Sequence, residues 1–96
     1  MPPHVAHDVQ ELITIAEQAM KLCSDVQNFD GAGALQKGIK AIKQSVEEIA
    51  LLDAKLTEYK RVNAFDECAT TKRELDEAVT KLNQQKDAVR NTLTHL

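Results

Sequence analysis

Apolar residues recur along this chain at alternating steps of three and four, and the pattern breaks in two places. An average spacing of 3.5 residues is typical of helices that pack lengthwise on neighbouring helices. The pattern predicts three helices, at about 8–27, 31–60 and 66–94. Two short connections fold such helices back on one another. The predicted fold is therefore all-α, an antiparallel three-helix bundle (up-down-up) with coiled-coil-like seams.

The two breaks repeat one short pattern at a constant separation of 36 residues (65 − 29). Asp is a favoured N-cap residue, and an apolar residue just before the cap often packs back on the new helix. Each Asp of the repeat is therefore expected to cap a helix, and each Phe to fill a corner of the bundle. The aligned pairs are Val26 and Val62, Phe29 and Phe65, and Asp30 and Asp66.

The first helix is predicted to open at Asp8, with Glu11 reaching back as in a capping box. Residues 1–7 then form a flexible tail, and residues 8–96 form a single domain. Because this helix is shorter than the other two, the second and third helices should continue beyond it as a bare hairpin. Apolar residues there would not be covered by a third helix, and we expect them to bind a partner. These residues are Leu51, Leu52, Leu56 and Tyr59.

Composition and charge narrow the class of protein. The net charge of −3 comes from interspersed acids and bases, which disfavours nucleic-acid binding and anionic membranes, since both require a concentrated basic face. The apolar runs are too short for a membrane span or a signal peptide. The predicted topology places Cys23 and Cys68 at opposite ends, so free buried thiols in a reducing, cytoplasmic compartment are expected.

The chain offers no constellation typical of an enzyme. We find no Ser or Cys beside a base, no carboxylate pair and no phosphate-binding loop that stands out. The histidines, His4, His7 and His95, lack the convergent ligands that zinc requires. We therefore expect no catalysis, no cofactor and no metal.

Lysines on the second and third helices have two interpretations each. Lys37, Lys40 and Lys43 are either a solvated face balanced by neighbouring glutamates or a docking stripe for an acidic segment, tubulin tails included. Lys72 and Lys86 occupy seam positions, where a lysine either extends its ammonium group to water or fixes the register of the helices.

The corners resemble UVR-type helical hairpins, in which an aromatic and an acidic residue precede a new helix. The second copy is the closer match, with Leu56 and Tyr59 before the corner and Phe65-Asp66 followed by Arg73-Glu74-Leu75 after it. The resemblance implies a corner packed around the aromatic residue and a role in protein–protein contacts, as in repair nucleases and in ciliary-tip centrosomal scaffolds that bind tubulin. Length and helix count also resemble microtubule-interacting-and-trafficking domains.

The expected function is a non-catalytic interaction or scaffold module that presents helical surface to a partner helix or a second copy. The alternative is a basic-flank module that binds acidic tails or a cytoskeletal polymer, with a cytoskeletal or centrosomal location.

Overall fold

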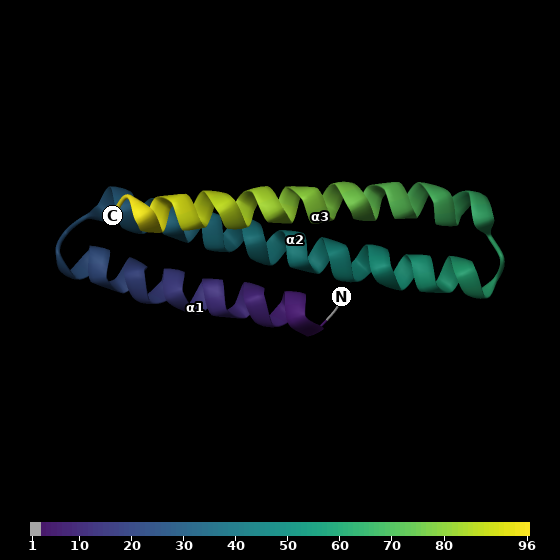
Figure 1. The fold of residues 1–96 in the computed structure, drawn as a ribbon, viewed down its shortest axis with the longest axis horizontal. Coiled ribbons are helices and arrows are strands. Elements are labelled where there is room, and N and C mark those ends of the chain that lie inside the picture. Colours follow the sequence, from purple (N-terminus) through teal and green to yellow (C-terminus); the bar gives the residue numbers. More distant parts are fainter. Residues whose placement is uncertain (1–2) are drawn as a thin grey trace.

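The computed structural model describes residues 3–96, with side chains from residue 7 onward. It contains three helices, α1 (Pro3–Asp25), α2 (Phe29–Arg61) and α3 (Phe65–Thr94). They form a rod with extents of 56 × 19 × 15 Å, and α1 covers only part of the hairpin made by α2 and α3 (Figure 1). The predicted antiparallel three-helix bundle is confirmed.

The first helix begins earlier than predicted. It starts at Pro3, so residues 3–7, expected to be part of a tail, are helical. Proline is well tolerated in the first turn of a helix, because its missing N–H would have no partner there. Asp8 therefore lies inside α1 rather than at its cap, and its carboxylate is available for contacts with α3.

Both corners adopt the same backbone geometry, so the sequence repeat is a structural repeat. Gln27 and Asn63 have left-handed φ angles of 62° and 57°. The N–H of the next residue donates to the carbonyl five residues back, at 2.7 Å for Asn28 and 2.9 Å for Ala64. With the accompanying bonds from Gln27 to Ser24 and from Asn63 to Lys60, this pattern forms a Schellman motif at each helix end.

The helices after the corners begin one residue before the predicted caps. The side chain of Asn28 caps α2 by accepting from the N–H of Gly31 at 3.1 Å, whereas α3 begins after Ala64 without a side-chain cap. The prediction that Asp30 and Asp66 are N-caps is therefore wrong. Both lie in the first turn, where a negative charge is stabilised by the helix dipole.

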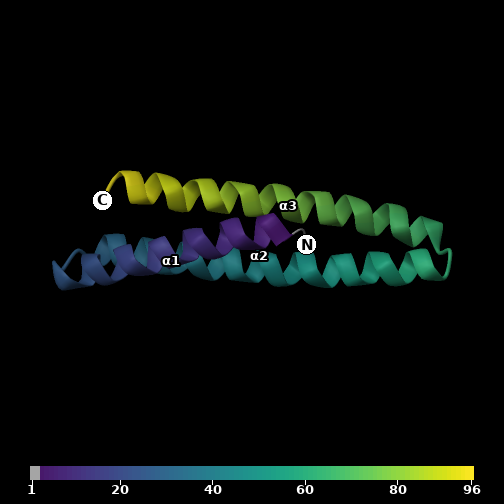
Figure 2. The same cartoon turned by 60° about the horizontal axis from the view of Figure 1, so that its bottom comes forward.

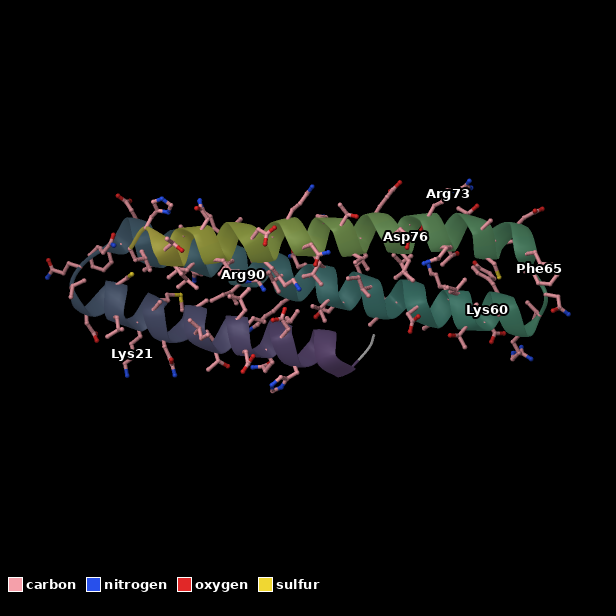
Figure 3. The ribbon with its side chains drawn as sticks, viewed as in Figure 1. Lys21, Lys60, Phe65, Arg73, Asp76 and Arg90 are labelled. Atoms are coloured by element: carbon pink, nitrogen blue, oxygen red, sulfur yellow. The ribbon has the colours of Figure 1, made fainter. Side chains whose placement is uncertain are left out.

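The prediction that the phenylalanines fill the corners is also wrong. Phe29 and Phe65 occupy the first helical position, and they are 66% and 70% exposed. Phe65 lies at the tip of the hairpin, away from the other helices (Figure 3). After each Schellman turn the next helix starts at the phenylalanine itself, so the phenylalanine does not precede a cap residue as predicted.

Replacing either phenylalanine with alanine should therefore have little effect on folding. We expect Phe29→Ala and Phe65→Ala each to lower the free energy of unfolding by less than about 1 kcal/mol, because little apolar area returns to water. Urea denaturation measures this change. A loss of several kcal/mol would mean that the rings are packed.

The left-handed residues should respond differently to glycine. Gln27 carries a β-carbon in a conformation that favours glycine, whereas Asn tolerates it. We expect Gln27→Gly to raise the free energy of unfolding by about 0.5–1 kcal/mol and Asn63→Gly to raise it by less. Thermal melts of the two variants make the comparison. Equal effects would show that residue identity at these turns does not matter.

A continuous row of α2 residues faces α3 along the whole hairpin. Three contacts show it: Gly31 lies against Leu96, Gly38 against Val89, and Ser45 hydrogen-bonds Gln85. The next members of this seven-residue spacing are Leu52 and Tyr59. Small α2 residues thus face large α3 residues in the bundle half, and this antiparallel register brings Leu52 and Tyr59 opposite the small Ala78 and Thr71 in the hairpin half.

A second row of α2 residues is apolar beside α1 and polar beyond the end of α1. Ala32, Ile39 and Val46 belong to the core or pack against it, and Ala32 shares a surface hollow with Met20 of α1. The same seven-residue spacing continues with Asp53 and Lys60, both exposed, beyond the end of α1. One of two rows becomes polar where no third helix covers it.

One row of the α3 seam, predicted at Lys72 and Val79, lies one residue away from its predicted position in the hairpin half. Thr71 and Ala78 are buried, whereas Lys72 and Val79 are exposed. Lys72 pairs with Asp76 of the same helix at 2.8 Å. The prediction for this row was wrong because α3 meets only α2 here, and the smaller residues allow the two helices to approach closely.

Candidate functional site

The apolar residues predicted to bind a partner differ in exposure. Leu51 is 66% exposed, but Leu52 and Leu56 are buried between α2 and α3, and Tyr59 is half-buried. The expectation that Leu52 and Leu56 form an uncovered strip is wrong, because α3 covers them. The hollow beside Tyr59 is lined mainly by charged and hydroxyl side chains: Lys55, Asp66, Glu67, Thr70, Thr71 and Glu74.

The three predicted lysines form a lysine stripe, Lys37, Lys40 and Lys43, along the solvent side of α2. All three are exposed. Within the described part of the chain, none of them makes an ion pair. Their ammonium groups are therefore available to solution.

An ionic contact ties the N-terminal half of α1 to α3. Lys86 Nζ lies 3.0 Å from Asp8 Oδ2, and Arg90 Nη2 lies 3.5 Å from the same oxygen. Arg90 projects from α3 toward α1 (Figure 3). The Lys86 side chain is only 11% exposed, against 48% for Asp8, so the lysine is the buried member. The hydrogen bond from Lys86, and then its charge, lower the pKa of Asp8 below its ordinary value of 3.8.

This contact should make stability sensitive to acid. Because the Asp8 pKa is lower in the folded chain than in the unfolded chain, the contribution is fully present above the unfolded pKa. It is lost as the pH falls through the folded pKa. We expect Asp8→Asn to flatten the stability profile below about pH 4, measured by urea denaturation across pH. Parallel profiles for the two proteins would contradict this.

A partly buried polar pair includes Gln85, which precedes Lys86 on α3. Ser45 Oγ donates to Gln85 Oε1 at 2.6 Å, and Ser45 is almost fully buried. A polar pair inside an apolar seam disfavours every register in which its members lose each other. Ser45 and Lys86 thus set the alignment of the three helices near the middle of the rod.

An exposed apolar row on α1 is the surface that the sequence interpretation missed. Ile15 and Leu22 of α1, with Val26 one residue beyond its end, are 52%, 66% and 75% exposed, and we call these three residues the α1 outer row. Asp8 lies one heptad before Ile15, so the row starts on the side that meets α3. Figure 2 shows α1 lying along the half of the α2 and α3 hairpin that holds the C-terminus.

Acidic side chains flank the α1 outer row. A shallow hollow beside Ile15 is lined by His7, Gln10, Glu11 and Thr14. Glu11 and Asp25 are both exposed and lie one heptad row farther from the core, with Gln18 between them. The signal was present in the sequence, as an apolar residue seven after Asp8 and another seven later, but the broad apolar stripe of α1 obscured it.

Other kinds of site find little support in this geometry. Among the described residues, no group of three or more potential ligands lies together as a metal site would require. Cys23 is buried, Cys68 is half-buried, and they lie near opposite ends of the rod. Within residues 3–96, no helix has the length and apolar character needed to cross a membrane.

Comparison with known proteins finds no family model, curated protein or solved structure that matches the chain.

Proposed function

We propose that the protein is a non-catalytic interaction module that binds a partner helix through the α1 outer row. The observation that supports this proposal is the exposure of three large apolar side chains, Ile15 and Leu22 on one face of α1 and Val26 just after its end. Apolar patches of a few hundred Å² on a soluble protein commonly mark interaction sites.

The spacing of the row suits a helix better than an extended segment. Ile15, Leu22 and Val26 are separated by seven and four residues, the repeat with which one helix inserts side chains between those of another. The α1 outer row replaces the hairpin end as the proposed binding surface.

Selection from a displayed library of amphipathic helices tests the proposal. We expect helices to be recovered that lose binding when Ile15 and Leu22 are both changed to Gln. The control is Leu51→Gln on α2, which removes a leucine as exposed as Leu22, 66% in each case. Failure to recover any helix, or equal losses in the control and the double variant, would refute the proposed function.

The lysine stripe supports a second candidate, the binding of acidic tails such as those of a cytoskeletal polymer. It is favoured by the exposure of Lys37, Lys40 and Lys43 without ion pairs among the described residues. Binding of a poly-glutamate peptide should weaken steeply with salt and in the triple Lys→Gln variant. A poly-glutamate peptide that does not bind at low salt would exclude this candidate.

A further inference from the structure

We infer that the partner helix of the α1 outer row carries basic residues on its flanks, an inference that rests on the proposed function. The helix α1 contains four acidic residues and one lysine, so its formal charge of −3 equals that of the whole chain. The charges of α2 and α3 therefore balance, and the acidic surplus is confined to the helix that carries the row.

Part of this negative charge lies beside the α1 outer row, where a partner helix would dock. Asp8 is engaged by Lys86 and Arg90, and Arg90 also contacts Asp87, which leaves that edge nearly neutral. Glu11 and Asp25 are exposed along the other edge. Lys21 projects outward from α1 (Figure 3), and among the described residues it forms no ion pair with Glu11 or Asp25. A docking helix would thus meet apolar side chains between a neutral and an acidic edge.

The same charges disfavour a second copy as the occupant. Two α1 outer rows packed antiparallel about a twofold axis would bring Leu22 near Ile15 of the other copy. Glu11 would then approach the other copy's Asp25, and like charges across an interface are destabilising. Lysine or arginine on the flanks of a foreign helix would instead meet these carboxylates with the opposite sign.

Three synthetic helices of identical apolar face test the inference. Each carries leucines at heptad spacing, and the flanking positions hold lysine in the first peptide, glutamine in the second and glutamate in the third. We expect isothermal titration at low salt to rank their affinities in that order. The lysine peptide should lose at least about tenfold in affinity with the Ile15→Gln, Leu22→Gln variant, a loss of two anchoring side chains.

A variant in which the two flanking acids are neutralised is the decisive test. Glu11→Gln with Asp25→Asn should reduce the advantage of the lysine peptide over the glutamine peptide to about twofold or less, as should salt near 0.5 M. Equal affinities for lysine and glutamine peptides in the unaltered protein would overturn the inference but leave the proposed function standing. If none of the three peptides binds, the proposed function itself fails.

Discussion

A methyl group added at Gly38 should push α2 and α3 apart. A β-carbon at this position would lie 2.6 Å from Val89 Cγ2, closer than two carbon atoms can approach. Val89 is buried and its branched side chain has few rotamers, so it cannot move aside easily. We expect Gly38→Ala to lower the free energy of unfolding by about 1–3 kcal/mol, although alanine favours helix more than glycine does.

Gly33 is the matched control, since it lies in the same helix and nothing lies within 4 Å of the added carbon. We expect Gly33→Ala to stabilise the protein by up to about 1 kcal/mol, the ordinary gain in helix propensity. Chemical denaturation of both variants separates contact from propensity. Val89→Ala should make Gly38→Ala less costly, so a double-mutant cycle without coupling would contradict the proposed contact.

The architecture could be predicted from the sequence because it depends on features that repeat many times. Each helix contains several heptads, and an error at one position, such as Val79 in place of Ala78, does not change the number or direction of helices. The seam itself was harder to place, because Thr71 and Ala78 are buried for their small size rather than for their hydrophobicity.

The corners could not be predicted in detail, because their geometry depends on local hydrogen bonds. The repeat of Phe and Asp correctly located both turns. It did not show that Gln27 and Asn63 adopt left-handed conformations, which shift the start of each following helix and leave Phe29 and Phe65 exposed. Neither Gln nor Asn requires such a conformation, so only the backbone bonds show that it occurs.

The candidate surface was missed for a related reason. Single-helix patterns show which faces are apolar, but they do not show which apolar residues a neighbouring helix covers. Ile15 and Leu22 resemble core residues by composition, yet they are 52% and 66% exposed. Asp8 and Lys86 are 78 residues apart, and nothing local in either helix indicates that they meet.

That contact leads to the largest expected loss of stability. Lys86→Glu places a carboxylate where the side chain is only 11% exposed and beside Asp8, 3.0 Å from the present ammonium group. A buried charge without its partner is strongly destabilising. Arg90 offers little compensation, because it already contacts Asp8 and Asp87. We therefore expect the free energy of unfolding to fall by about 3 kcal/mol.

Lys72→Glu is the control for this change, since Lys72 lies two heptads earlier on α3 and its side chain is 61% exposed. Its loss should stay below about 1 kcal/mol, as for other exposed ion pairs. Adding Asp8→Lys to Lys86→Glu reverses the pair and should recover most of the stability in urea denaturation. Equal losses for the two lysines, or no recovery in the double variant, would mean that the contact between α1 and α3 does not hold α1 in place. The α1 outer row would then lose the fixed position beside α3 on which its proposed role depends.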